Sequence, residues 1–171
     1  MTQRYLIALG SNMRHHRHGL PEQVIRAALA EIAADDLEVE AVSRTIHSRP
    51  LGPSRRRYAN AAAIVCGECD PPELLERLKR IERKFGRRPG GERWGARVLD
   101  LDIVLWQGGA WASVGLIVPH VAFRERRFVL GPACAIAAAW RDPVTGLLLR
   151  QLNARLTRRA ALPIAPPRRG P

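Results

Sequence analysis

The segment RVLDLDIVLW at residues 97–106 constrains the fold more than any other stretch of the chain. Its apolar residues are typical of a buried strand, yet Asp100 and Asp102 interrupt it two residues apart. Because residues two apart on a strand point to the same face, both carboxylates are expected side by side on one face of a sheet. The opposite face then carries the core residues Leu99, Leu101 and Ile103. A carboxylate in an apolar interior costs several kcal/mol unless it is paired or holds a metal.

Two interpretations of this acidic pair remain open on spacing alone. Neighbouring carboxylates repel each other, so a positive group should lie between or beside them. Mg²⁺ suits such a pair because it binds a few carboxylates, keeps some water and takes further ligands from phosphate oxygens. Salt bridges from both acids to arginines on an exposed sheet face would satisfy the same pattern.

The elements around this segment predict one α+β domain. We expect strands at 4–10, 37–48, 58–66 and 97–106, with Gly108-Gly109 turning the last into a short partner. Helical spacing predicts one helix within 18–34. Asp70 as N-cap, Pro71 and a capping box completed by Glu73 predict a second helix, which Gly86 ends. Its apolar stripe consists of Leu74, Leu78, Ile81 and Phe85.

This order of elements is that of the ferredoxin-like fold, strand–helix–strand–strand–helix–strand. Helical segments within 121–130 and 147–156 follow the last strand. We therefore predict a ferredoxin-like βαββαβ sandwich with a short added hairpin and extra C-terminal helices. The domain should span residues 1–156, and the basic, proline-rich tail 157–171 should be disordered.

Charge and composition indicate the class of partner. The net charge is +12, and seven arginines with one acid lie between Arg141 and the end of the chain. The remaining positive charge indicates anionic partners, phosphates first, and does not distinguish a nucleotide from a polynucleotide. No segment approaches the roughly 20 apolar residues that cross a bilayer, and the N-terminus lacks the pattern of a secretory signal. We therefore expect a cytoplasmic, monomeric protein without a membrane partner.

Two short motifs are candidates for metal or redox chemistry. Cys66 and Cys69 form a CxxC, but zinc needs four ligands and the chain has no second pair. A strand end running into a helix cap is the favoured interpretation. His15, His16 and His18 could bind a transition metal, although a solvated polar loop is the better interpretation.

Basic segments flank the acidic pair in the sequence. GRRPGGERWGAR at 86–97 precedes it, and VPHVAFRERRF at 118–128 follows it. Basic loops on both sides of two carboxylates are typical of a site for a metal-bound polyphosphate. The chain contains no GxxxxGK[ST] motif, so this is not a P-loop.

These segments together resemble the 6-hydroxymethyl-7,8-dihydropterin pyrophosphokinase family of folate biosynthesis. The resemblance is carried by ALGSN (8–12), RPLGP (49–53), YANAA (58–62), IERKFGR (81–87), ERWGARVLDLDIVL (92–105) and VPHVAFRERRFVLGP (118–132). It implies the ferredoxin-like fold and a magnesium-dependent enzyme. The family transfers a diphosphate from ATP to the hydroxymethyl group of the pterin and releases AMP.

The resemblance implies roles on the ATP side of the site. Asp100 and Asp102 would hold two magnesium ions, and Asp102 would also help to take the hydroxyl proton. Arg87 and Arg97 would bind the phosphates and stabilise the charge that develops as AMP leaves. The further residues implied to contact ATP are Glu82, Trp94, Ile103, His120 and Arg126.

The resemblance also implies a pterin site. Tyr58 and Phe128 would stack on the flat ring, and Asn60 would read its hydrogen-bonding edge. Trp94 lies in the loop that would close over both substrates. The pocket would be shaped further by Ser48, Pro50 and Leu51.

Some positions depart from the family pattern. Pro89 and Gly90 replace basic residues of the closing loop, and Ala96, Val121 and Arg49 also differ from the usual residues. Arg88, or the run Arg55–Arg57, is a hypothetical replacement for the missing charge. A catalytically weakened relative that only binds pterin or nucleotide therefore remains an alternative. An RRM-like RNA-binding module shares the fold pattern, but the predicted strands lack its set of exposed aromatics, so nucleic acid is not the expected partner.

Overall fold

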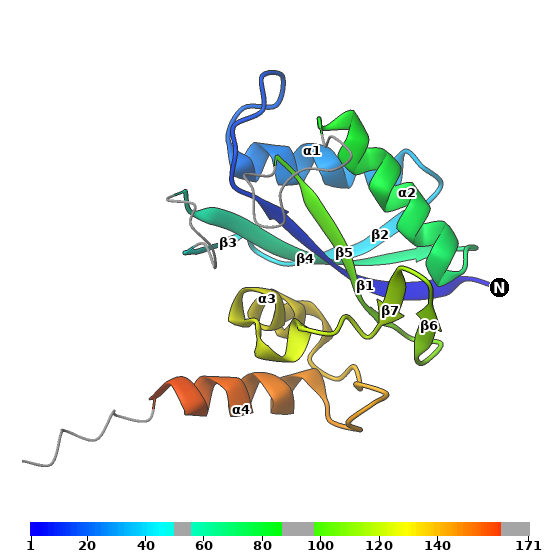
Figure 1. The fold of residues 1–171 in the computed structure, drawn as a ribbon, viewed down its shortest axis with the longest axis vertical. Helices are drawn as coiled ribbons and strands as arrows, with labels where there is room; N and C mark the ends of the chain where they lie inside the picture. The colour runs from blue at the N-terminus through cyan, green and yellow to red at the C-terminus, as the bar shows by residue number, and fades with distance from the viewer. Residues whose placement is uncertain (50–55, 87–97, 162–171) are drawn as a thin grey trace, which may run out of the picture.

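The computed structural model describes residues 1–49, 56–86 and 98–161. An antiparallel sheet with the strand order β2-β4-β1-β5 forms the centre of the molecule, and β3 also pairs with β4 (Figure 1). A separate hairpin, β6-β7, follows β5. The strands are β1 (Gln3–Ser11), β2 (Glu38–Val42), β3 (Ile46–Ser48), β4 (Tyr58–Gly67), β5 (Asp100–Trp106), β6 (Trp111–Ser113) and β7 (Leu116–Val118). The predicted α+β architecture with an added hairpin is confirmed.

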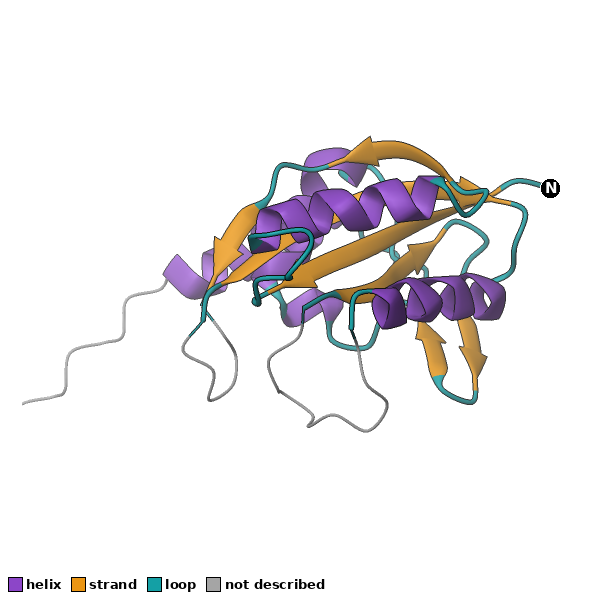
Figure 2. Ribbon diagram, turned by 90° about the horizontal axis from the view of Figure 1, so that it is seen from above, coloured by secondary structure: helices purple, strands orange, loops and turns teal. Residues whose placement is uncertain are grey.

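Helices cover both faces of the sheet (Figures 1 and 2). On one face lie α1 (Pro21–Ala33) and α2 (Pro71–Lys84), and on the other α3 (Arg127–Ala137) and α4 (Leu149–Ala161). Alternate residues of β1 divide between two cores: Ile7 packs toward α1 and α2, whereas Leu6 packs toward α3 and α4. The C-terminal helices therefore add a third layer to the two-layer ferredoxin-like unit.

The sequence signals at α2 correspond to observed contacts. The amide of Glu73 donates to Asp70 Oδ1 at 2.9 Å, and the amide of Asp70 donates to Glu73 Oε2 at 2.9 Å. This is the predicted capping box, which satisfies two backbone donors at the start of the helix. The apolar stripe is buried against the sheet through Leu74, Leu78 and Ile81. α2 is therefore a firmly anchored helix.

Three boundaries differ from the sequence-based expectation. The strand expected over 37–48 is divided into β2 and β3, because Ser43 bridges to Ala62 with both its amide and its hydroxyl. The helix expected within 121–130 becomes a 3-10 turn, η1 (Phe123–Glu125), followed by α3, since Arg126 between them is extended. α4 continues to Ala161, past residue 156 where we expected the tail to begin.

A β-bulge interrupts the pairing of β5 with β1. Leu6 pairs with Leu105 and Ile7 with Ile103, so Val104 is an extra residue on β5. The carbonyl of Val104 accepts a hydrogen bond from the amide of His120 at 3.0 Å. Bulges often occur beside active sites, where they redirect a strand. Here the bulge attaches the segment that carries His120 directly to the strand that carries the two acids.

The cysteine and histidine motifs are structural within the described residues. Cys66 packs in the core beneath α3 and α4, whereas Cys69 packs in the opposite core, so the CxxC forms neither a metal site nor a redox pair. His15 is buried, and its ring lies 5.6 Å from that of Phe85. The histidine turn is therefore packed against the end of α2 at His15, whereas His16 and Arg17 are exposed. None of the described helices has the length and apolarity that spanning a membrane requires.

Candidate active site

The two acids lie on the sheet face that is covered by α3 and α4. Asp100 pairs with Gly10 of β1 and Asp102 with Ala8, so their side chains share one face. The opposite face of β5 carries the buried residues Leu99, Leu101 and Ile103, which pack toward α1 and α2 as predicted. The Ile103 side chain is in that core and does not face the acidic pair.

The electrostatics of Asp102 favour a bound cation. Burial raises the pKa of Asp102, and the neighbouring carboxylate of Asp100 raises it further. His120, Lys79 and Arg126 act in the opposite direction but do not outweigh these effects. In the described part of the chain no side chain forms a salt bridge with Asp102. Among the described residues, Asp102 is therefore not neutralised by a salt bridge to an arginine, which was the second interpretation of the acidic pair.

His120 and Arg126 bring polar groups to the same place. The ring Nδ1 of His120 accepts from the amide of Ala122 at 3.2 Å. Burial lowers the pKa of His120, so the ring is neutral at pH 7 and carries its proton on Nε2. The Arg126 guanidinium lies 5.9 Å from the centre of the Phe128 ring, and its charge reaches both Asp102 and His120. A proton donor and a cation thus lie beside the acidic pair.

Small residues separate the acids from Asn60. Gly10 pairs with Asn60 of β4 on one side and with Asp100 on the other, while Ala8 lies between Ala62 and Asp102. These positions belong to the same sheet face, because residues two apart on a strand share a face. A Cβ added at Gly10 would lie 3.8 Å from Asn60 Oδ1 and meet nothing closer. Ala8 and Gly10 therefore form a shallow surface between Asn60 and Asp100, which we call the floor of the site.

Three of the predicted pterin residues, Ser48, Tyr58 and Asn60, lie together at one end of this floor. Asn60 Nδ2 donates to Ser48 Oγ at 2.9 Å and to the carbonyl of Tyr58 at 3.3 Å, which fixes the side-chain amide. Ser48 and Tyr58 are paired residues of β3 and β4. Phe128 is part of the first turn of α3 and packs at the edge of the core on this face.

Glu82 differs most from an ordinary helix glutamate. Its side chain is 0% exposed, and Oε1 accepts from the amide of Leu101 at 2.7 Å and from Lys79 Nζ at 3.0 Å. Lys79, Ala8 and Gly10 are not predicted as site residues from the sequence. A lysine three residues before a glutamate on a helix is a weak signal, since such pairs are common on exposed helices.

Several predicted residues lie outside the described ranges. They are Pro50, Leu51, Arg87, Trp94 and Arg97, together with the proposed substitutes Arg55 and Arg88 and the departures Pro89, Gly90 and Ala96. Arg124, which the sequence groups with the basic residues near the acids, instead donates to both carboxylate oxygens of Asp142, at 2.8 and 2.7 Å.

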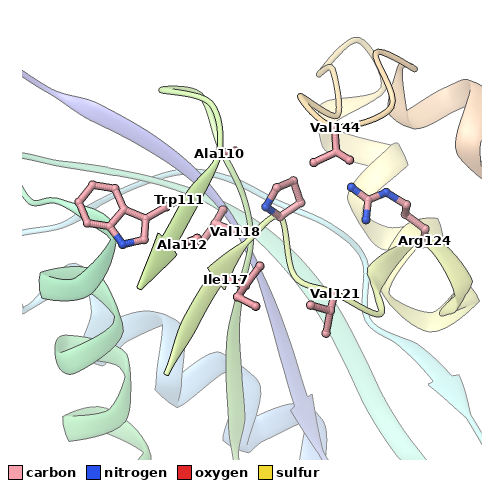
Figure 3. A pocket seen from close by; sticks show the side chains of 9 residues that line it. Ala110, Trp111, Ala112, Ile117, Val118, Val121, Arg124 and Val144 are labelled. Carbon is pink, nitrogen blue, oxygen red and sulfur yellow. The ribbon is translucent and has the colours of Figure 1, made fainter. Parts of the chain in front are cut away.

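An apolar groove, which Arg124 also lines, contains neither of the two acids. It has a volume of about 400 Å³ and lies between the β6-β7 hairpin and the connection from α3 to α4 (Figure 3). Trp111, Ile117, Val121 and Val144 contribute to its lining, and no carboxylate does. None of the predicted site residues lines it. The groove therefore does not have the chemistry of a polyphosphate site.

Comparisons with known proteins identify the family of the chain. Residues 6–138 match the sequence profile described as 7,8-dihydro-6-hydroxymethylpterin-pyrophosphokinase (HPPK). The 2-amino-4-hydroxy-6-hydroxymethyldihydropteridine pyrophosphokinase of Synechocystis is 38% identical over 143 residues, which cover 83% of this chain and 73% of the relative. The enzyme of that name from Pseudomonas aeruginosa is 38% identical over 145 residues, which cover 84% and 86%.

Solved structures show the same fold. The wild-type HPPK-DHPS of Plasmodium falciparum superposes with a TM-score of 0.72 at 12% identity, covering 93% of this chain and 45% of that one. An HPPK-DHPS in complex with substrates gives a TM-score of 0.73 at 11% identity, covering 94% and 44%. The chain thus spans less than half of these two-part proteins. On the sequence matches, the chain belongs to the 7,8-dihydro-6-hydroxymethylpterin-pyrophosphokinase family.

Proposed function

We propose that Asp100 and Asp102 hold the magnesium ions of Mg–ATP while this enzyme transfers a diphosphate to the hydroxymethyl group of 6-hydroxymethyl-7,8-dihydropterin. Family membership gives the activity, a pyrophosphokinase of folate biosynthesis that uses ATP. The observation that supports the placement is the carboxylate pair, in which burial and Asp100 raise the pKa of Asp102 without a salt bridge to it from the described residues.

The donor set fits magnesium. Two carboxylates share one face, and the described residues include no cluster of three or more acids, cysteines and histidines that would form a closed metal cage. Mg²⁺ is commonly bound by one or two carboxylates together with water and substrate phosphates. When bound, it supplies charge neutralisation of the polyphosphate and alignment of the attacking and leaving oxygens.

The remaining residues bind and orient the two substrates. His120, with its proton on Nε2, donates to a phosphate oxygen, and Arg126 neutralises phosphate charge beside it. The pterin lies on the floor between Asn60 and Asp100, where Tyr58 and Phe128 provide aromatic faces. This places the hydroxymethyl group near the acids and the ring edge at Asn60. Ser48 acts through its bond to Asn60.

Charge and proton movement define the chemical step. The hydroxyl oxygen of the pterin bonds to the β-phosphorus of ATP, the bond between the α–β bridging oxygen and the β-phosphorus breaks, and AMP leaves with the electron pair. Asp102 assists removal of the hydroxyl proton. Arg87 and Arg97 stabilise the developing charge, and Trp94, Pro50 and Leu51 complete the closed site; these assignments rest on the family resemblance.

Product analysis tests this function. Purified protein is incubated with ATP, Mg²⁺ and 6-hydroxymethyl-7,8-dihydropterin, and a reaction without the pterin is the control. We expect AMP and the pterin diphosphate in equal amounts, and neither product in the control. ADP would show transfer of a single phosphoryl group. Pterin binding without any nucleotide product would identify a binding protein instead of an enzyme.

A further inference from the structure

The edge of the sheet at β5 carries a pair of side chains that the proposed chemistry does not use. Within the described residues β5 is the last strand on its side of the sheet, so alternate backbone groups point away from β1. At Leu101 these groups find side-chain partners. The amide of Leu101 donates to Glu82 Oε1 at 2.7 Å, and Lys79 Nζ donates to the carbonyl of Leu101 at 3.4 Å.

Lys79 and Glu82 also bind each other. Lys79 Nζ lies 3.0 Å from Glu82 Oε1, so the lysine, the glutamate and Leu101 form a closed set of three contacts. The two residues are three apart on α2 and therefore project from one side of the helix. A fully buried carboxylate needs such compensation, because burial without partners costs several kcal/mol.

The position of Leu101 makes these contacts relevant to the acids. The Leu101 amide belongs to the peptide group that joins Asp100 to Leu101, and the Leu101 carbonyl belongs to the peptide group that joins Leu101 to Asp102. Glu82 therefore fixes the peptide plane after one acid, and Lys79 fixes the plane before the other. These planes set the direction in which each Cα–Cβ bond leaves the strand.

The helix that supplies the pair is rigidly held. α2 begins with a capping box, and its apolar stripe packs against the sheet face that includes Leu101. Functional groups are positioned best when the residues behind them are on such an element. A displacement of about 1 Å in a reacting group can cost about 10²-fold in rate.

We propose that Lys79 and Glu82 are positioning residues for diphosphate transfer: they clamp the Leu101 peptide from α2 and so hold Asp100 and Asp102 at the spacing that the metal-bound substrate requires. This inference rests on the proposed role of the two acids. The clamp acts from the opposite side of β5, through the backbone, and its partners are fixed before substrate binds.

Three single variants on α2 test the clamp. Lys79→Met removes the donor to Leu101 while keeping most of the apolar stem, and Glu82→Gln keeps an oxygen that can accept from the Leu101 amide. Lys84→Met is the matched control, because Lys84 lies on the same helix and pairs with Glu31 on the surface. For each variant we would measure kcat, both KM values, the melting temperature, and amide hydrogen exchange at Leu101 and Asp102 by NMR.

The clamp predicts a specific combination of results. Lys79→Met should lower kcat about 10- to 100-fold relative to Lys84→Met. The pterin KM should stay close to that of the control. The melting temperature should fall, because the buried carboxylate of Glu82 loses its cation, so kcat is compared at a temperature at which both variants are folded. Exchange at Asp102 and Leu101 should accelerate by more than the lower global stability accounts for. Glu82→Gln should retain slow exchange at Leu101 and lose less kcat than Lys79→Met. If Glu82→Gln does not fold, the comparison of Lys79→Met with Lys84→Met still tests the inference.

Other outcomes overturn the inference. If kcat of Lys79→Met lies within twofold of Lys84→Met, or if exchange at Asp102 and Leu101 is unchanged, the clamp does not position the acids. An increase confined to the KM for ATP would make Lys79 a direct substrate contact. Failure of the clamp is distinguishable from failure of the proposed function, because Asp102→Asn would then still abolish turnover. If Asp102→Asn retained turnover, the proposed function itself would fail.

Discussion

Two carboxylates of this molecule have opposite surroundings: Asp142, which is buried, and Asp102, which is half-buried. Asp142, in the connection between α3 and α4, is 0% exposed and accepts two hydrogen bonds from the Arg124 guanidinium. Burial raises its pKa, but hydrogen bonds from Arg124, Thr145 and the amide of Val144 outweigh that effect and hold the pKa below its ordinary value. At Asp102 burial and a second carboxylate raise the pKa.

The difference shows how the chain uses charge in its interior. Arg124 supplies Asp142 with a cation, and the pair joins η1 to the connection that leads into α4. No described side chain makes a salt bridge to Asp102. A carboxylate that stabilises the fold has its counter-ion built in, whereas one that binds a metal substrate complex has to remain available for it.

The largest expected effect is on turnover at the acidic pair. Asp100→Asn and Asp102→Asn should each lower kcat by at least about 10³-fold, because each removes charge that stabilises the transition state. Circular dichroism should show that both variants remain folded. Steady-state assays of AMP formation measure the loss. Near wild-type turnover in either variant would make that carboxylate structural, like Asp142.

The second effect concerns stability at the contrasting carboxylate. Asp142→Ala should lower the free energy of unfolding by about 3 kcal/mol, since it leaves the Arg124 guanidinium without its buried partner. Urea denaturation at pH 7 measures this, and kcat of the folded variant at low temperature should stay near that of the wild type. Because the folded-state pKa of Asp142 is lowered, its contribution is present above the ordinary aspartate pKa of about 3.9 and is lost as the pH falls below that value. A difference that persisted unchanged at pH 2.5 would contradict this account.

The smallest expected effect is an increase in stability. In metal-free protein at pH 7, Asp102→Asn should raise the melting temperature by a few degrees, because it removes a carboxyl group whose pKa is raised in the folded state. The gain should vanish below about pH 3.9, where the carboxylate is protonated in the unfolded chain as well. Adding Mg²⁺ and an ATP analogue should stabilise the wild type more than the variant. A variant that is less stable than the wild type at pH 7 would show that the Asp102 carboxylate stabilises the fold, as that of Asp142 does.

Local patterns predicted much of this structure. The capping box at Asp70 and Glu73 is contained within four residues, and the period-2 pattern of β5 was enough to place Asp100 and Asp102 on one face. Features that depend on distant contacts were not predictable. The bulge at Val104 involves His120, and the division of β2 from β3 depends on the contact between Ser43 and Ala62.

The same limit applies to the candidate site. Burial of Glu82 depends on Leu101, which is nineteen residues further along the chain, and Arg124 pairs with Asp142 across eighteen. From the sequence alone, Glu82 is assigned to the ATP site by resemblance, and Arg124 is only one of the basic residues in the segment 118–128. Tertiary contacts are needed to distinguish a residue that contacts the protein itself, as Glu82 contacts Leu101, from one that contacts the substrate.

A crystal structure of the enzyme with Mg²⁺, a non-hydrolysable ATP analogue and the pterin tests the central claim most directly. The account predicts magnesium at about 2.0–2.1 Å from oxygens of both Asp100 and Asp102 and bound to the polyphosphate, with Asp142 still paired to Arg124. A nucleotide bound elsewhere, with Asp100 and Asp102 closed against guanidinium groups and no ion between them, would contradict it.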